Sequence, residues 1–182
     1  MLGDRRLLEW SMLRARQVSD GVVLVVPSDR VGDAEPLADV VVAGGATRSA
    51  SVRAGLAAVP AEAEVIAVHD AARPFASETL WGQVVDHAGA GHDAVVPAIP
   101  IGDTLREVDG RTVDRSRFVA VQTPQAFRAA MLRRAHATEA EGTDDASLVE
   151  AIGGQVLVVD GEPQNRKITT PSDLDAMQVF FA

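Results

Sequence analysis

Short, continuous runs of valine and isoleucine constrain the fold of this chain more than any other feature. Because these runs do not alternate with polar residues, they predict strands covered on both faces, as in mostly parallel sheets. Stretches with helical spacing lie between most of the runs, and this alternation is typical of α/β folds with a doubly wound sheet. The 182 residues are enough for one domain, which we expect to span 1–182. The predicted strands are 22–26, 40–43, 65–68, 94–96, 119–121 and 156–159.

Helical patterning accounts for most of the sequence between these strands. Ser77 is a predicted N-cap, because a serine hydroxyl can accept a hydrogen bond from the first turn of the helix that follows. The last helix has Thr170 as its predicted N-cap and Pro171 at its first position, where a missing N–H leaves no bond unmade. Helices are expected at 7–15, 52–59, 80–88, 126–136, 144–152 and 172–180.

Residues 97–118 interrupt the alternation of strands and helices. Asp109-Gly110 lies between two short segments of strand-like composition, and this pattern predicts a β-hairpin. An isolated hairpin is marginal in water unless something packs against it. Two interpretations therefore stay open, a solvated excursion or an arm over 99–118 that docks on a second subunit.

Composition excludes several classes of protein. The longest apolar runs have only five or six residues, far short of a membrane span, so we expect no membrane segment. A formal net charge of −9 argues against nucleic-acid binding, which usually rests on a basic surface. An anionic substrate would therefore need a local cluster of basic groups. The lack of cysteine excludes disulfides and thiolate metal sites, and it is consistent with a cytoplasmic location.

The apolar run at 65–68 ends in an unexpected pair of charges. Asp70 follows the carboxyl end of this predicted strand, which is where α/β sheets bind ligands. A single carboxylate there could serve Mg²⁺, which takes its other ligands from phosphate and water. Arg73 could then face a phosphate group. An ion pair confined to the turn is the alternative, and the spacing alone leaves both interpretations open.

Gly44 and Gly45 follow the strand at 40–43 and open a helix. Glycine lets the backbone approach a ligand closely, and Ser51 with the helix-start N–H groups could hold the polar edges of a nucleotide. The pattern is neither a dinucleotide fingerprint nor a P-loop, so an ordinary turn is the alternative.

Two segments near the C-terminus carry further candidates. Thr143 is a plausible N-cap for the helix at 144–152, which would give it a purely structural role. Arg166 and Lys167 bring two cations close to a helix start, and on so acidic a chain they form a candidate phosphate site. None of the four histidines has metal-ligand spacing, and we assign none of them a catalytic role.

Seven motifs in a fixed order resemble one enzyme family. They are GGATRSASV, VHDAARPF, GDTL, VDR, TPQ, TDDASLVE and NRKITTPSDL, and they resemble the 2-C-methyl-D-erythritol 4-phosphate cytidylyltransferases from Gly3 nearly to the C-terminus. The resemblance implies a three-layer αβα, Rossmann-like nucleotidyltransferase that dimerises through its hairpin arm. It also implies Mg²⁺-dependent cytidylyl transfer from CTP to methylerythritol phosphate, in the non-mevalonate isoprenoid pathway. The products would be pyrophosphate and 4-diphosphocytidyl-2-C-methylerythritol.

The same resemblance implies roles for individual residues. The residues implied in catalysis are Lys167, Arg73 and Arg115. Those implied in binding CTP are Gly45, Arg48, Ser51 and Asp70, and Asp70 would also hold the metal. Those implied in binding methylerythritol phosphate are Asp103, Thr104, Arg115, Thr123, Thr143 and Lys167. One departure is Ala46, which stands where relatives can carry a polar residue facing the base.

The start of the chain departs from the family pattern. The family begins with a buried strand and a glycine-rich loop that wraps the triphosphate, whereas this sequence starts beyond them. We therefore expect an incomplete sheet with unpaired backbone groups. Two alternatives remain, a cytidylyltransferase for another polyol phosphate such as ribitol 5-phosphate, and a dimeric remnant without activity. The doubled alanine in HDAARP favours the methylerythritol phosphate enzyme over the ribitol type.

Overall fold

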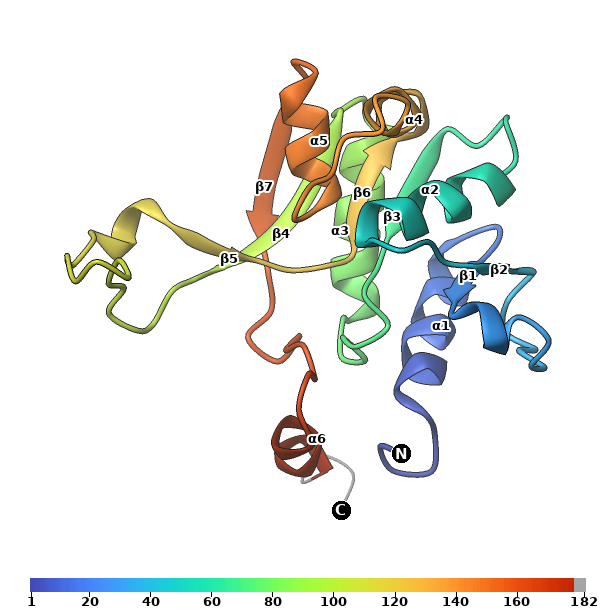
Figure 1. The fold of residues 1–182 in the computed structure, drawn as a ribbon, viewed down its shortest axis with the longest axis horizontal. Coiled ribbons are helices and arrows are strands. Elements are labelled where there is room, and N and C mark those ends of the chain that lie inside the picture. Colours follow the sequence, from blue (N-terminus) through green and yellow to red (C-terminus); the bar gives the residue numbers. More distant parts are fainter. Residues whose placement is uncertain (179–182) are drawn as a thin grey trace.

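The computed structural model describes residues 1–178, which form two sheets with helices around them (Figure 1). Strands β1 (Val23–Val26) and β2 (Val40–Ala43) make a two-stranded parallel sheet. The larger sheet has the order β3-β6-β4-β5, and β7 pairs with β4. Its strands are β3 (Val65–Val68), β4 (Ala94–Pro100), β5 (Val119–Val121), β6 (Gln125–Arg128) and β7 (Val156–Asp160).

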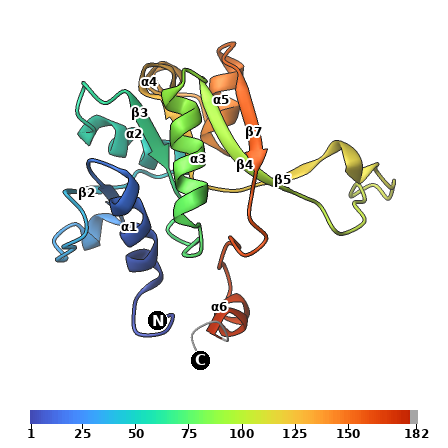
Figure 2. The same ribbon diagram turned by 180° about the vertical axis from the view of Figure 1, so that it is seen from behind.

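Helices cover both faces of the larger sheet, so the three-layer αβα arrangement is confirmed (Figures 1 and 2). On one face Phe127 and Val96 pack in a core shared with α2, α4 and α5. On the other face Val95 and Ala126 pack against Val84 of α3. The helices are α1 (Leu7–Val18), α2 (Arg48–Ala58), α3 (Glu78–Gly89), α4 (Ala129–His136), α5 (Asp145–Ala151) and α6 (Pro171–Gln178). Two short 3₁₀ turns, η1 (Ser28–Arg30) and η2 (Arg115–Arg117), complete the elements.

The expectation of a mostly parallel sheet is wrong for the larger sheet. Strand β6 runs between β3 and β4 and is antiparallel to both, and β5 is also antiparallel to β4. Only the β4–β7 pair of this sheet is parallel. Sequence patterning assigned residues 126–128 to a helix, because a strand of four residues directly followed by a helix carries no pattern of its own. Alternate burial of Ala126 and Phe127 on opposite faces of the sheet decides the strand.

Two of the three predicted N-caps are confirmed by their hydrogen bonds. The Ser77 hydroxyl accepts from the N–H of Leu80, and Thr170 accepts from the N–H of Asp173. Thr143 is not the cap of α5, because the side chain of Asp144 accepts from the N–H of Ser147 instead. The predicted end of the last helix, at residue 180, lies outside the described residues.

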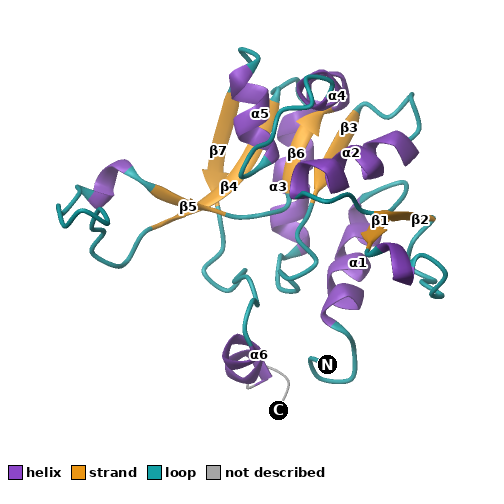
Figure 3. Cartoon of the chain, in the orientation of Figure 1, coloured by secondary structure: helices purple, strands orange, loops and turns teal. Residues whose placement is uncertain are grey.

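The predicted hairpin is present as a single bridge rather than two strands. Arg106 and Thr112 form the bridge, and Gly110 adopts a φ of +102° at the turn, a conformation that favours glycine. Residues 99 and 100, which we placed in the arm, belong to β4. The excursion at 101–118 projects from the body as mostly loop (Figure 3). Its side-chain hydrogen bonds, within the described residues, join members of the excursion to one another.

None of the helices within 1–178 has the length and apolar character needed to cross a bilayer.

Candidate functional site

Asp70 and Arg73 are the first and last residues of a β-turn that follows β3. The N–H of Arg73 donates to the carbonyl of Asp70 at 2.9 Å, which closes the turn. The Arg73 Nε lies 3.8 Å from the Asp70 carboxylate, so the two side chains face the same space. The ion pair within the turn is therefore present, but both side chains also belong to a wider cluster.

Every carbonyl of this turn is held by a different donor. Besides the bond within the turn, the Ser11 hydroxyl donates to Ala71 at 3.0 Å, and the N–H of Ile168 donates to Ala72 at 2.8 Å. His69 Nε2 lies 3.0 Å from the carbonyl of Arg73. Four carbonyls with four separate partners leave the turn little freedom, so its side chains are presented in a fixed direction.

Lys167 joins the turn from a distant part of the sequence. Its Nζ lies 2.9 Å from the Asp70 carboxylate, and both side chains are partly exposed. Burial lowers the pKa of Arg73, and the negative charge of Asp70 opposes that shift only in part. The cluster thus presents two cations around one carboxylate at the end of β3, which is the local concentration of positive charge that an anionic ligand needs on an acidic chain.

Two buried amide side chains bring Lys167 to this position. The amide of Gln122 donates to the carbonyl of Glu162 at 2.8 Å and accepts from its N–H at 3.0 Å. Asn165 donates to the carbonyl of Thr123 at 2.9 Å, and Arg73 Nη1 donates to the carbonyl of Asn165 at 2.8 Å. The segment after β7 is therefore fastened to both the β5–β6 loop and the turn.

Sequence reasoning assigned no role to Gln122, which directly precedes TPQ, or to Asn165, which is the first residue of NRKITTPSDL. An isolated amide in a loop gives no sign that it will be buried. Thr123, which the resemblance implies in substrate binding, lies beside the turn, where its hydroxyl is 3.0 Å from the N–H of Asp70.

Gly45 and Ser51 form a second group at the start of α2. The N–H of Gly45 lies 3.1 Å from the Ser51 hydroxyl, which also donates to the carbonyl of Thr47 at 2.9 Å. A Cβ added at Gly45 would lie 2.5 Å from the Cβ of Ala50, so only glycine fits this close approach. Packing alone thus requires glycine at this position, independently of any ligand.

Arg48 of α2 is tied to α5 by a buried carboxylate. Its Nη2 donates to Asp145 at 2.7 Å, and the other oxygen of Asp145 lies 2.9 Å from His136 Nε2. Burial opposes the charged form of Arg48, but the hydrogen bond and charge of Asp145, with Asp70 and Asp144 further away, leave its pKa raised. Burial likewise opposes ionisation of Asp145, and His136 and Arg48 outweigh it and hold that pKa below its usual value.

Other predicted residues lie apart from both groups. Asp103, Thr104 and Arg115 are exposed on the excursion at 101–118, where Arg115 donates to the carbonyl of Gly102. Thr143 is exposed beside the α5 cap, and Ala46 is exposed next to Gly45. Within one chain, therefore, the structure brings together Asp70, Arg73, Thr123 and Lys167, but not the residues of the excursion.

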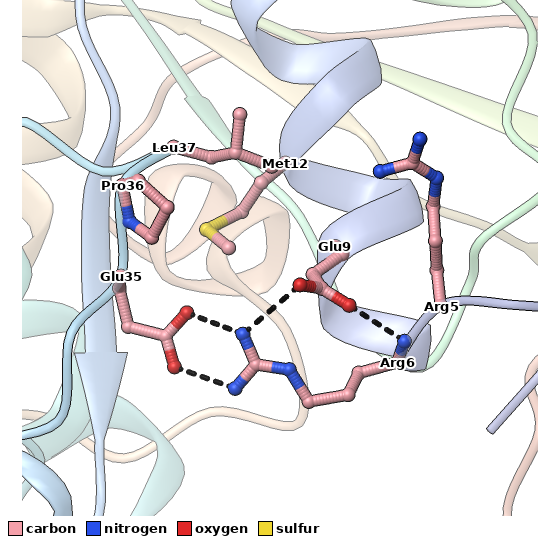
Figure 4. Close-up of a pocket in the computed structure, with 7 residues that line it drawn as sticks. All are labelled: Arg5, Arg6, Glu9, Met12, Glu35, Pro36 and Leu37. Atoms are coloured by element: carbon pink, nitrogen blue, oxygen red, sulfur yellow. Dashed lines mark hydrogen bonds and ion pairs between the residues drawn. The ribbon is translucent and has the colours of Figure 1, made fainter.

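A small pocket near the start of α1 contains none of these residues (Figure 4). Arg6 donates to both oxygens of Glu35, at 2.8 Å each, and to Glu9 at 3.2 Å. Arg6, Glu9 and Glu35 of the pocket are thus engaged with one another, and the Asp70 cluster remains the better candidate site. The lining residues are Arg5, Arg6, Glu9, Met12, Glu35, Pro36 and Leu37.

The sequence model of the 2-C-methyl-D-erythritol 4-phosphate cytidylyltransferases matches residues 1–182. The chain belongs to this family. It is accordingly a nucleotidyltransferase of the cytidylyltransferase class, and the activity of its family lies in the non-mevalonate route to isoprenoids.

Relatives and solved structures agree with the family assignment. The cytidylyltransferase of Nocardia farcinica is 47% identical over 172 residues, which cover 89% of this chain and 74% of the relative. A bifunctional IspD/IspF enzyme of Nitratidesulfovibrio vulgaris is also 47% identical, but the match covers only 44% of that longer protein. The crystal structure of the Thermus thermophilus cytidylyltransferase superposes with a TM-score of 0.88 at 41% identity, covering 99% of this chain and 91% of that one.

Family membership also bears on the open alternatives. The named relatives carry the methylerythritol phosphate activity, which favours this substrate over ribitol 5-phosphate. For the metal, the described residues contain no group of three or more histidine, cysteine, aspartate or glutamate side chains able to hold one. A single partly exposed carboxylate such as Asp70 still fits Mg²⁺, because this ion commonly takes one or two carboxylates and completes its shell with phosphate and water.

Proposed function

We propose that the Asp70–Arg73 turn and Lys167 form the reaction centre for cytidylyl transfer from CTP to methylerythritol phosphate. The observation that carries this proposal is the meeting of Lys167 and Asp70 at 2.9 Å, with Arg73 at 3.8 Å from the same carboxylate. Residues so far apart in the sequence gather here through a network of buried amides. An ordinary surface ion pair contributes only about 0–1 kcal/mol to stability, which does not account for a buried network of this kind.

In the proposed reaction a phosphate oxygen of methylerythritol phosphate attacks the α-phosphorus of CTP. The bond from that phosphorus to the oxygen bridging the β-phosphate breaks, and pyrophosphate leaves. Lys167 and Arg73 would lie against the phosphate oxygens and stabilise the charge that spreads over them in the transition state. The rigid turn would supply orientation, since in-line transfer depends on the placement of both substrates.

Mg²⁺ fits at Asp70 and would neutralise phosphate charge there when it is bound. In the absence of nucleotide, Lys167 contacts the same carboxylate and holds it toward the site. On binding, the lysine would exchange this partner for a phosphate oxygen, which requires only the rotation of an exposed side chain.

The cytidine moiety would bind at the start of α2. Gly45 would let the backbone approach the base, while Ser51 and Arg48 line the pocket. Arg48 is already held by the buried Asp145, so its guanidinium needs little ordering when the nucleotide arrives. Because Ala46 offers no polar atom, the selection of cytosine would rest on backbone groups.

A second subunit would complete the site for methylerythritol phosphate. We propose that the excursion at 101–118 docks on a partner chain and delivers Asp103, Thr104 and Arg115 to the partner's turn, with Thr143 and Thr123 beside the phosphate. Val108 at the tip is fully exposed, and Phe118 and Val119 at the base are about half exposed, which suits a surface that is covered in a dimer. That the protein works in the cytoplasm, as a homodimer, remains a prediction.

Pyrophosphate release from the purified chain tests the proposal. The chain is mixed with CTP and Mg²⁺, and then with methylerythritol phosphate or ribitol 5-phosphate in separate reactions. Release with methylerythritol phosphate alone is the expected result. Release with ribitol phosphate alone would replace the substrate, and no release from a folded dimer would leave the non-catalytic alternative.

A further inference from the structure

His69 takes part in a chain of three hydrogen bonds that the proposed reaction does not use. Its Nε2 lies 3.0 Å from the carbonyl of Arg73, and its Nδ1 lies 3.1 Å from the hydroxyl of Thr123. The same hydroxyl oxygen lies 3.0 Å from the N–H of Asp70. These hydrogen bonds thus run from Arg73, at the end of the turn, through an imidazole and a hydroxyl to Asp70 at its start.

With a neutral imidazole, the chemistry of the two ends fixes the direction of every proton in this chain. A carbonyl can only accept, so the hydrogen of the His69 ring must sit on Nε2 and point at Arg73. In a neutral ring Nδ1 then has only a lone pair, so the Thr123 hydroxyl must donate to it. The Asp70 N–H can only donate, and it uses a lone pair on the Thr123 oxygen. No other arrangement with a neutral ring satisfies all three bonds.

The surroundings hold the ring in this orientation. The indole of Trp81, which is 3% exposed, lies 4.9 Å from the imidazole between ring centroids and is tilted by 50°. Thr123 is 6% exposed, and its backbone carbonyl is held by the buried Asn165. A rotation of the His69 ring would therefore break two hydrogen bonds and disturb the packing against Trp81.

We infer that His69, protonated on Nε2, is a positioning residue that clamps both ends of the Asp70–Arg73 turn through Thr123. With Nδ1 unprotonated, the Thr123 hydroxyl proton is committed to His69, so Thr123 orients Asp70 and does not donate to substrate phosphate. This inference rests on the proposed function only in its effect on catalysis. The proton arrangement itself belongs to the free protein.

The proton arrangement is tested by ¹⁵N NMR of the histidine side chains in the full chain at neutral pH. We expect one ring with a protonated Nε2, an unprotonated Nδ1 and no averaging between tautomers, and its signals should vanish in a His69→Asn variant. A ring at this position with Nδ1 protonated, or one that averages between both tautomers, would overturn the inference. The measurement needs no substrate, so it stands even if the proposed activity fails.

The positioning role is tested by kinetics with CTP and methylerythritol phosphate. His69→Phe keeps a ring beside Trp81 but removes both hydrogen bonds, and Thr123→Val keeps the shape of Thr123 without its hydroxyl. Each change should lower kcat by about tenfold with little change in either KM, and the double variant should be no worse than the poorer single one, because residues in one network do not act additively.

Two conservative variants distinguish the loss of these hydrogen bonds from general damage to the fold. Thr123→Ser restores the hydroxyl and should restore kcat, and His69→Asn restores an acceptor at the Nδ1 position and should recover part of it. The opposite pattern is equally clear. A rise in KM for methylerythritol phosphate in Thr123→Val, with effects that add to those of His69→Phe, would make Thr123 a direct substrate ligand and refute the inference.

Discussion

Lys167 is the only lysine in the chain, and it contacts Asp70 at the proposed reaction centre. Lys167→Met should lower kcat by roughly 10²- to 10³-fold, the loss typical of removing one group that stabilises transition-state charge. Its effect on the free energy of unfolding should stay below about 1 kcal/mol, because the pair is partly exposed. Pyrophosphate release and urea unfolding measure the two effects.

Lys167→Arg is the matched control for this prediction, because it keeps the charge but changes its geometry. It should retain more activity than Lys167→Met while leaving stability unchanged. If Lys167→Met lost stability and activity in proportion, the lysine would have a structural role and its place in the reaction would be refuted.

His69 should make the stability of the protein depend on pH. Burial lowers the pKa of His69 to about 4, from the ordinary value of 6.5 for histidine, although the Arg73 carbonyl and the charge of Asp70 act in the opposite direction. Between these two values the unfolded chain binds a proton that the folded chain does not, so folding loses stability as the pH falls from 6.5 toward 4. The slope should approach about 1.4 kcal/mol per pH unit for this one group.

Urea unfolding of the wild type and of His69→Gln at several pH values measures this contribution. The variant should show a shallower loss of stability than the wild type between pH 6.5 and 4.5. Below pH 4 the two curves should run parallel, because carboxylates with lowered pKa values, such as Asp145 and Asp173, then dominate in both proteins. Parallel curves over the whole range would contradict the assignment to His69.

At the scale of elements, the start of α5 depends on one carboxylate with two tasks. Asp144 caps the helix by accepting from the N–H of Ser147 at 3.0 Å, and its other oxygen accepts from the buried amide of Gln125 at 3.0 Å. Asp144→Ala should therefore cost roughly 2–3 kcal/mol, of which about 1 comes from the cap and the rest from a buried donor left without a partner.

Thr47→Ala provides the comparison, because Thr47 caps α2 at 3.0 Å from the N–H of Ala50 on an exposed surface. This change should cost only about 1 kcal/mol in urea unfolding. Equal costs for the two variants would show that the contact between Asp144 and Gln125 contributes nothing to stability.

At the scale of the whole molecule, the excursion and the turn would act in different subunits of one site. A subunit with Arg115→Ala keeps its own turn, while a subunit with Asp70→Ala keeps its own excursion. A mixed dimer would then contain one site built only from unchanged residues. Random exchange of equal amounts should restore about a quarter of the wild-type activity, since half of the dimers are mixed and each has one intact site.

Activity after mixing, together with the mass of the assembly by light scattering, measures this restoration. Each variant alone should be nearly inactive but dimeric. Mixed dimers that form without any recovery of activity would remove the shared site, and the excursion would then have no part in catalysis.

Local chemistry allowed much of this protein to be predicted from its sequence. The runs at 40–43 and 65–68 form strands with those bounds, and Ser77 and Thr170 cap the helices that follow them. The turn at Gly110 was predicted in the same way. These features depend on residues a few positions apart, so hydrophobic periodicity, capping and turn chemistry are sufficient to reveal them.

Tertiary structure alone decided the relative direction of the strands in the larger sheet and the assembly of the candidate site. Strand β6 has no distinct pattern, and its place between β3 and β4 became clear only from the partners of Ala126 and Phe127. Arg73 meets Asn165 across 92 residues of sequence, and buried amides then place Lys167 beside Asp70. Such contacts depend on the path of the whole chain. A buried glutamine or asparagine looks the same in sequence as an exposed one, because its partners lie on other elements.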